Sequence, residues 1–177
     1  NVAPHNIYPC KPSGGKSDCD YVLIYCSRAP GSTNFEDLMR VIGREDLAKD
    51  PRMATPQSRY LYKEELDAAI SEWTKKYTKF EAMKLVAEAR VPAGAVMDLG
   101  EVISNEFLRA RGTIVDIDHP EYGRIGVPTF PIKLSNSPVE LEPAPETGEH
   151  SKEILLKLGY SEEEIASYAE RGIVGIV

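Results

Sequence analysis

Histidine side chains that could act in catalysis or bind a metal are scattered along this sequence. His5, His119 and His150 stand in separate loops or helix starts, and none has a second ligand three or four positions away. A zinc site needs several such donors close together, so the spacing predicts no metal site. His150 could act as a general base only with a partner in hydrogen-bond reach, and the sequence shows none. We therefore expect His150 to serve as a helix-start or packing residue.

The cysteines also lack a spacing that favours chemistry. Cys10, Cys19 and Cys26 are odd in number and include no CxxC pair, which favours reduced thiols in a cytoplasmic protein. Cys26 closes an apolar run, so we expect it to pack as a small buried hydrophobe.

A loop after a predicted strand holds the polar pair that we place near a substrate. Residues 21–26, Tyr-Val-Leu-Ile-Tyr-Cys, are β-branched or aromatic nearly throughout, which predicts a strand buried on both faces. Ser27 and Arg28 follow directly, and loops at strand ends often carry function. An ordinary solvated or ion-paired Arg28 fits the sequence at least as well. No nucleophile elbow and no dinucleotide-binding glycine pattern is present, so the residues alone indicate an α/β chain without a visible active site.

Composition and charge narrow the class of protein. The 177 residues are 42% hydrophobic and 28% charged, as in soluble globular proteins with a core. The net charge of −7 argues against a nucleic-acid partner, which would require a basic surface. No apolar run approaches the ~20 residues that span a bilayer, and no signal segment is visible. We expect a cytoplasmic protein without a membrane partner. The sequence opens on Asn1 without a methionine, as expected for a fragment of a longer protein.

Helical periodicity and capping residues predict most elements of the first hundred residues. The chain begins with a short edge strand at Ile7 and Tyr8. A helix is then predicted over 35–42, capped by Asn34, and one long helix over 56–77, opened by Thr55, with Trp73 in the core. Two further helices begin at capping boxes, one at Thr78–Glu81 and a short one at Asp98–Glu101.

After Gly112 the apolar period changes from about 3.6 to 2. Strands are predicted over 113–118, 124–127 and 130–134, as a small antiparallel meander. The Pro- and Glu-rich residues 136–149 predict an extended connector lying along a surface. Two helices follow, over 150–158 and from a capping box at Ser161–Glu164 onward.

A series of short phrases, taken in order, resembles the C-terminal half of a family III CoA-transferase, the CaiB/BaiF-like group of formyl-CoA/oxalate and carnitine CoA-transferases. The phrases cover essentially the whole chain: Ile42-Gly-Arg-Glu-Asp-Leu47, Asp50-Pro-Arg52, Glu65-Leu-Asp67, Trp73-Thr74, Val91-Pro-Ala-Gly94, Leu108-Arg-Ala-Arg-Gly112, Asp118-His-Pro120, Pro131-Ile-Lys-Leu-Ser135, Pro143-Ala-Pro145, Gly148-Glu-His-Ser151 and Leu158-Gly-Tyr-Ser-Glu-Glu-Glu-Ile165.

This resemblance implies an α/β fold in which an α+β small domain is followed by a C-terminal tail. The N-terminal Rossmann-like half of the family's interlocked two-domain fold would be absent. Residues 1–17 would form a linker, residues 18–105 the small domain, and residues 106–177 a segment returning to the large domain. The partners implied are the missing N-terminal half and a second copy in an interlocked homodimer.

The resemblance also implies the reaction. Enzymes of this family transfer CoA between an acyl-CoA and a carboxylic acid through an aspartyl anhydride and an enzyme-bound CoA thioester. The aspartate would lie upstream of Asn1, so we expect no catalytic residue in this chain and no activity of the chain alone. The CoA thioester would be a substrate, with no covalently bound cofactor. Acyl donor and acceptor stay open.

Two alternatives remain beside the transferase. Related acyl-CoA racemases carry a glutamate just after the strand that matches residues 21–26, where this chain has Ser27 and Arg28; this difference favours a transferase over a 2-methylacyl-CoA racemase. A non-catalytic interaction module could reuse the same half-fold. The apolar end Ile173–Val177 and the Pro-rich connector argue against it, because both fit the surface of a partner.

Overall fold

The computed structural model describes residues 3–14, 19–27, 29 and 31–176. The chain divides into two compact units, Asn1–Val102 and Ile103–Val177, here named the first and the second unit. The division expected from the family resemblance, into a linker, a small domain and a returning tail, stays a prediction.

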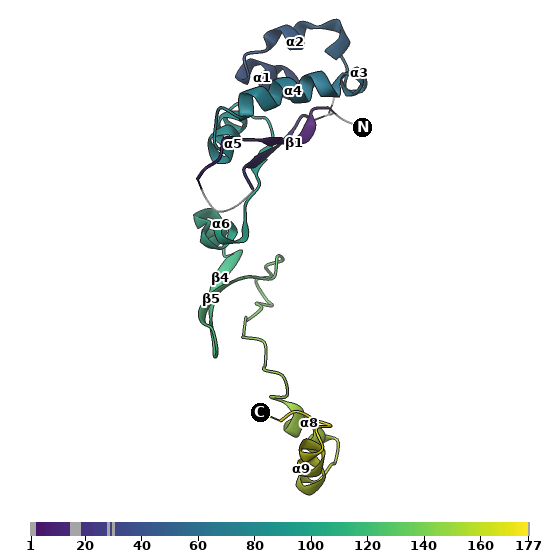
Figure 1. The fold of residues 1–177 in the computed structure, drawn as a ribbon, viewed down its shortest axis with the longest axis vertical. Coiled ribbons are helices and arrows are strands. Elements are labelled where there is room, and N and C mark those ends of the chain that lie inside the picture. Colours follow the sequence, from purple (N-terminus) through teal and green to yellow (C-terminus); the bar gives the residue numbers. More distant parts are fainter. Residues whose placement is uncertain (1–2, 15–18, 28, 30, 177) are drawn as a thin grey trace. The chain divides into compact units, whose positions relative to one another are not determined.

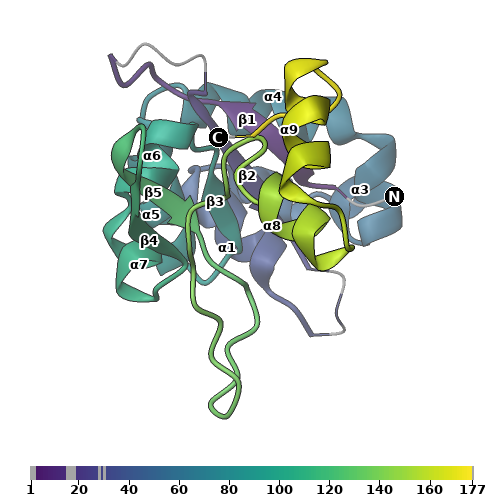
Figure 2. The same cartoon turned by 90° about the horizontal axis from the view of Figure 1, so that it is seen from below.

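The first unit is built on a three-stranded antiparallel sheet. Its strands are β1 (His5–Pro9), β2 (Tyr21–Tyr25) and β3 (Ala93–Ala95), and β2 lies between the other two (Figure 2). Tyr8 pairs with Val22 across one side of β2, and Ile24 pairs with Ala93 across the other. The predicted edge strand at Ile7 and Tyr8 is confirmed as part of β1.

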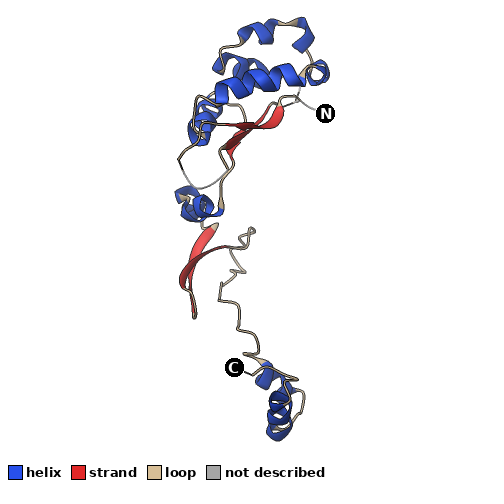
Figure 3. Ribbon diagram, viewed as in Figure 1, coloured by secondary structure: helices blue, strands red, loops and turns tan. Residues whose placement is uncertain are grey.

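The prediction that β2 is buried on both faces is wrong. Val22 and Ile24 are fully buried, whereas Tyr21 is 41% exposed and Leu23 is 38% exposed. The helices over residues 63–74 and 79–88 pack on the face of the sheet that holds Val22 and Ile24 (Figure 3). Successive side chains of a strand point to opposite faces of the sheet. A continuous apolar run therefore places apolar residues on both faces, even where only one face is covered by other elements.

Five helices and one 3-10 turn lie within the first unit as the structure describes it: α1 (Asn34–Val41), α2 (Glu45–Lys49), η1 (Pro51–Met53), α3 (Pro56–Leu61), α4 (Lys63–Thr74) and α5 (Lys79–Glu88). A further helix, α6 (Leu99–Ser104), begins in the first unit and ends two residues beyond Val102. The single long helix predicted over 56–77 is therefore wrong. Tyr62, at φ −112° and ψ 24°, separates α3 from α4. An interruption of one residue leaves the apolar spacing almost unchanged, so periodicity alone could not reveal it.

The capping boxes predicted from short sequence patterns are confirmed. Thr78 and Glu81 exchange hydrogen bonds at the start of α5, and Ser161 and Glu164 do the same at the start of α9 (Glu162–Glu170). Thr55 caps α3 together with Ser58. The cap predicted at Asn34 is wrong, because Thr33 occupies that position and Asn34 already belongs to α1.

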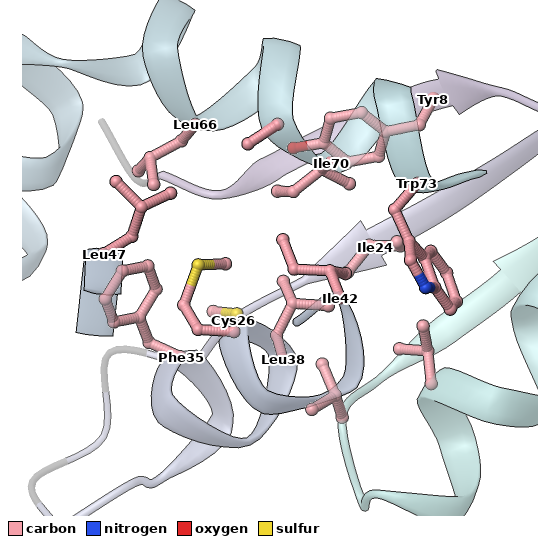
Figure 4. Close-up of a cluster of buried hydrophobic side chains, with 14 of the residues drawn as sticks. Tyr8, Ile24, Cys26, Phe35, Leu38, Ile42, Leu47, Leu66, Ile70 and Trp73 are labelled. Carbon is pink, nitrogen blue, oxygen red and sulfur yellow. The ribbon is translucent and has the colours of Figure 1, made fainter. Parts of the chain in front are cut away.

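The core of the first unit lies between the sheet and helices α1 and α4 (Figure 4). Ile24 of β2, Leu38 of α1 and Ile70 of α4 are fully inaccessible to solvent. Trp73 is 7% exposed and Cys26 is 2% exposed, so both take the core positions predicted for them. Their burial fixes the sheet and the loop that follows β2 against the helices.

A buried lysine joins the start of α5 to the start of α6. Lys79 is 1% exposed, and its Nζ donates to Glu101 Oε2 at 2.6 Å, Val96 O at 2.9 Å and Cys19 O at 3.2 Å. Glu101 Oε2 also accepts from Asp98 N at 2.9 Å, and Asp98 Oδ1 accepts from Glu101 N at 2.8 Å. The predicted capping box at Asp98–Glu101 is thus present and shares its carboxylate with Lys79.

The second unit contains a β-hairpin and a pair of helices (Figure 1). Its further elements are α7 (Glu106–Ala110), β4 (Ile114–His119), β5 (Gly123–Pro128), α8 (Ser151–Lys157) and α9. The two strands of the predicted hairpin are confirmed, and the connector before α8 has neither helix nor strand. The third strand predicted over 130–134 is wrong: Phe130, Ile132 and Leu134 are at least half exposed, and no described strand pairs with them.

A tight turn at Gly148 lies against Gly175, near the C-terminal end of the second unit. Its φ is +96°, and a Cβ there would lie 2.8 Å from Gly175 O. We expect Gly148→Ala to destabilise the α8–α9 pair by about 1–3 kcal/mol, measured as faster amide hydrogen exchange in both helices. Gly159→Ala is the matched control, because Gly159 has φ +92° but open space around it. Equal losses in the two variants would contradict a role for the Gly175 contact.

Candidate functional site

The loop after β2 is the candidate site that the sequence places near a substrate. Ser27 N donates to Asn34 Oδ1 at 3.2 Å, and Ser27 Oγ accepts from Ala29 N at 3.1 Å. The hydroxyl oxygen therefore stabilises its own turn. Arg28 lies outside the described residues. The substrate-proximal role of Ser27 and Arg28 stays a prediction.

Asn34 links this loop to the end of α5. While its Oδ1 accepts from Ser27 N, its Nδ2 donates to Arg90 O at 3.0 Å. Arg90 has φ 61°, a left-handed conformation that is uncommon for a residue other than glycine. One amide side chain thus holds two backbone segments that lie far apart in sequence. This is a stronger constraint on the loop than the helix cap predicted for Asn34.

A buried cation packs beside the loop, and the sequence analysis missed it. Arg59 of α3 is 7% exposed, and its guanidinium carbon lies 4.2 Å from the ring centroid of Phe35. Burial lowers the pKa of Arg59, and the nearby carboxylate of Glu36 opposes that shift. The sequence did contain one indication that Arg59 is buried. Arg59 stands seven residues before Leu66, and residues at that spacing lie on the same face of the predicted helix. Charged residues are rarely fully buried, so a series of apolar positions does not include an arginine.

Side chains that could serve as nucleophiles are held protonated. Burial raises the pKa of the Cys26 thiol to about 12 and that of the Cys10 thiol to about 11. Burial, assisted by the Asp67 carboxylate that accepts from its hydroxyl at 2.6 Å, also raises the pKa of Tyr8 far above its usual range. A thiolate, not a thiol, is the nucleophile, so neither Cys10 nor Cys26 is poised for catalysis at neutral pH. None of the three cysteines forms a disulfide.

Thiol labelling tests this protection. With a pKa of about 12, roughly one Cys26 thiol in 10⁴ is ionised at pH 8. We expect iodoacetamide to modify Cys26 and Cys10 far more slowly than the partly exposed Cys19, with a rate that rises about tenfold per pH unit. Peptide mass spectrometry measures each site, and labelling in urea is the control. Equal rates for all three cysteines in the folded protein would contradict the burial.

A cavity of about 490 Å³ lies beside the hairpin of the second unit. Most of its lining is apolar, and its two charged residues are already paired. Lys133 Nζ donates to Arg111 O at 2.6 Å, and Asp116 accepts from Arg109 at 3.0 Å and from Arg124 at 3.1 Å. Both charged side chains of the lining are thus already hydrogen-bonded within the protein.

The described part of the chain offers neither a cluster of metal ligands nor a membrane-spanning helix. Within the described ranges, no group of three or more His, Cys, Asp or Glu side chains could hold a metal ion. None of the helices in those ranges has the length and apolar character required to cross a bilayer.

Comparison with known proteins gives a family match. Residues 1–151 match the family described as CoA-transferase family III. A formyl-CoA:oxalate CoA-transferase of Bradyrhizobium diazoefficiens is 35% identical over 170 residues, which are 96% of this chain and 39% of that protein. One from Rhodopseudomonas palustris strain TIE-1 is 37% identical with the same coverage. The chain therefore spans about two fifths of the length of these relatives.

Solved structures agree with this match. A CAIB/BAIF family protein from Brucella suis is 27% identical with a TM-score of 0.66, over 89% of this chain and 38% of that one. Rv3272 from Mycobacterium tuberculosis, at 22% identity, shares the fold with a TM-score of 0.64, over 86% of this chain and 40% of that one. The family resemblance of the sequence phrases and the predicted α/β class are confirmed.

Proposed function

Because this chain belongs to CoA-transferase family III, we propose that the complete protein transfers coenzyme A between an acyl-CoA and a carboxylic acid. The observation that carries the proposal is the similarity to formyl-CoA:oxalate CoA-transferases over 96% of the chain. Formyl-CoA and oxalate are accordingly the first donor and acceptor to test. Coenzyme A enters as a thioester substrate, without a covalently bound cofactor.

The proposed nucleophile is an aspartate carboxylate upstream of Asn1, as the family resemblance implies. The carboxylate attacks the acyl-CoA carbonyl, the carbon–sulfur bond breaks, and CoA thiolate leaves a mixed anhydride. The thiolate then attacks the aspartyl carbonyl, which releases the donor acid and forms an aspartyl-CoA thioester. The acceptor carboxylate repeats these steps in reverse order. Covalent catalysis by a carboxylate thus divides one acyl exchange into reversible steps.

The state of two buried thiols and of the Ser27 hydroxyl supports this assignment. The thiols of Cys10 and Cys26 are protonated at neutral pH, and the Ser27 hydroxyl oxygen already accepts a turn hydrogen bond. We propose that this chain contributes the small domain with the Ser27–Arg28 loop near the substrate. We expect the chain alone to be inactive.

Exposed apolar side chains support a further partner surface. Leu158 is 70% exposed, Ile173 is 58% exposed and Ile154 is 53% exposed, all in the second unit. Large exposed apolar groups that lie together mark interaction surfaces. We propose that residues 106–177 pack on the remainder of the complete protein, and that two copies associate as an interlocked homodimer.

An acyl-exchange assay tests the proposed function. The complete protein is incubated with formyl-CoA and oxalate, then with other acyl-CoA and acid pairs, and the CoA esters are separated by chromatography. We expect a new CoA ester only when an acceptor acid is present, and none from the 177-residue chain alone. Epimerisation of a 2-methylacyl-CoA without a second acid would instead establish the racemase alternative. Absence of exchange with every pair would contradict the proposal.

A further inference from the structure

The cavity of about 490 Å³ beside the hairpin is an apolar hollow that is open to water. Its volume falls in the range of about 300–1,000 Å³ that is usual for small-molecule sites. Strand β4 contributes Val115 and Ile117 to its lining, and the segment after β5 contributes Phe130, Ile132 and Leu134. Ile132 is 60% exposed and Leu134 is 57% exposed. An apolar ligand of suitable size would therefore remove unfavourable surface from water.

A smaller cavity of about 230 Å³ adjoins the first, because Thr129, Phe130 and Lys133 line both. Its lining adds Arg111 and Thr113, and as the structure describes it this lining contains no carboxylate. The apolar hollow thus continues into a smaller one that carries two cationic side chains. In this article the two together are named the hairpin pocket.

The two cations of the smaller cavity are not neutralised by the described residues. Lys133 Nζ donates to Arg111 O at 2.6 Å and to Gly112 O at 3.0 Å. Both acceptors are uncharged, and one of the three ammonium N–H groups is left over. The Arg111 guanidinium carbon lies 5.6 Å from the ring centroid of Phe107, and neither cation forms an ion pair with a carboxylate of the described ranges. Both positive charges are therefore available to a ligand.

The carboxylate that lines the larger cavity does not oppose a negatively charged ligand. Asp116 lies 3.0 Å from Arg109 and 3.1 Å from Arg124. These three side chains together carry one net positive charge. The surroundings of the hairpin pocket are thus cationic, although the whole chain has a net charge of −7.

We propose that the hairpin pocket binds an amphipathic carboxylate, with its apolar body in the larger cavity and its carboxylate group beside Arg111 and Lys133. A guanidinium edge presents two parallel N–H donors that match the two oxygens of a carboxylate. A single charge is favoured because the acidic chain opposes each further negative charge. Formate and oxalate have no apolar body, so this site is separate from the proposed CoA transfer and does not rest on it.

Methyl NMR of protein with ¹³C-labelled isoleucine tests the proposal, in both the 177-residue chain and the complete protein. Ile117 and Ile132 report on the larger cavity, while the buried Ile70 and Ile165 are references for the first and the second unit. The probes are decanoate, decanol and oxalate, which supply body and charge, body alone and charge alone. Decanoate is kept below the concentration at which it forms micelles. We expect saturable shifts of Ile117 and Ile132 with decanoate, about tenfold weaker binding of decanol, and no shift with oxalate.

A charge variant tests the anionic end of the site. Arg111→Gln should weaken decanoate binding by about tenfold and leave decanol binding unchanged. Arg171→Gln is the matched control, because Arg171 is also exposed and lies 5.8 Å from the ring centroid of Tyr168, yet lines neither cavity. It should change neither affinity. Unmoved Ile165 signals in the two variants show that the second unit keeps its fold.

An apolar variant tests the other end. Ile132→Ser should weaken the binding of both decanoate and decanol, with Ile117 as the reporter. Ile154→Ser is its control, because Ile154 is 53% exposed in the same unit but lies outside both linings.

The same titrations give the results that would overturn the proposal. Equal affinities for decanoate and decanol, or decanoate binding that is unchanged in Arg111→Gln, would remove the role of the cations. The absence of saturable shifts in both proteins would remove the site. Binding to the chain that is lost in the complete protein would show that the hollow is filled by protein there. Acyl exchange is measured separately, so an active enzyme that does not bind decanoate rejects this inference alone.

Discussion

Replacement of Lys79 by alanine is expected to lower the free energy of unfolding of the first unit by about 3 kcal/mol. The substitution removes the donor from Val96 O, Cys19 O and the Glu101 carboxylate together. It also removes a positive charge that lies against the partly buried Glu101 at the start of α6. Removal of one partner of a buried ion pair is costly because the remaining charge is uncompensated. Urea unfolding followed by Trp73 fluorescence measures the loss.

Lys84 provides the control for this variant. Its Nζ lies 4.0 Å from Glu88, and both side chains are well exposed, so Lys84→Ala should cost less than about 0.5 kcal/mol. Lys79→Met separates charge from packing, because methionine restores most of the buried volume without a donor. If Lys79→Ala destabilised the protein no more than Lys84→Ala, the buried pair would have no structural role.

Truncation of Ile70 should have a similar effect through packing alone. Ile70 is fully buried on the face of α4 that covers the sheet (Figure 4). Ile70→Ala is expected to destabilise the first unit by about 3 kcal/mol, from lost burial and the cavity that remains. Thermal unfolding measures the change, and Ile70→Val should lose about 1 kcal/mol.

An exposed position on the neighbouring helix calibrates the core variant. Leu61 is 78% exposed, so Leu61→Ala should change stability by no more than about 0.5 kcal/mol. A loss at Leu61 as large as that at Ile70 would contradict the exposure of Leu61 in this structure. It would also point to a partner surface over Leu61.

Features set by neighbouring residues were predictable from the sequence. The capping boxes at Thr78 and Ser161 need only a side chain three positions away, and both are present. The hairpin was predictable because its two strands, β4 and β5, follow each other along the chain and pair with each other. The third strand at 130–134 was not, because alternation identifies a strand only if another segment pairs with it. Exposure of Leu23 likewise depends on what covers the second face of the sheet, which the apolar run itself does not specify.

The candidate site and the buried Lys79 were less predictable because their contacts join distant parts of the chain. Lys79 finds its acceptors 17, 22 and 60 positions away, and Asn34 bonds a carbonyl 56 positions away. Arg59 was overlooked because its charge placed it outside the apolar series. Family phrases identified the protein family, whereas only the fold revealed which cation is buried without an ion-pair partner among the described residues.

The order of strands in the first unit has a consequence for synthesis on the ribosome. β1 and β2 are neighbours in sequence and can pair early, but β3 completes the sheet only after α1 to α5 have been made. Until then one edge of β2 offers unpaired backbone groups, a state in which nascent chains can associate wrongly. The helices pack on the Val22 and Ile24 side of β2, so they can shelter its apolar face but not its open edge. Translation speed between α5 and β3 should therefore influence the yield of soluble protein.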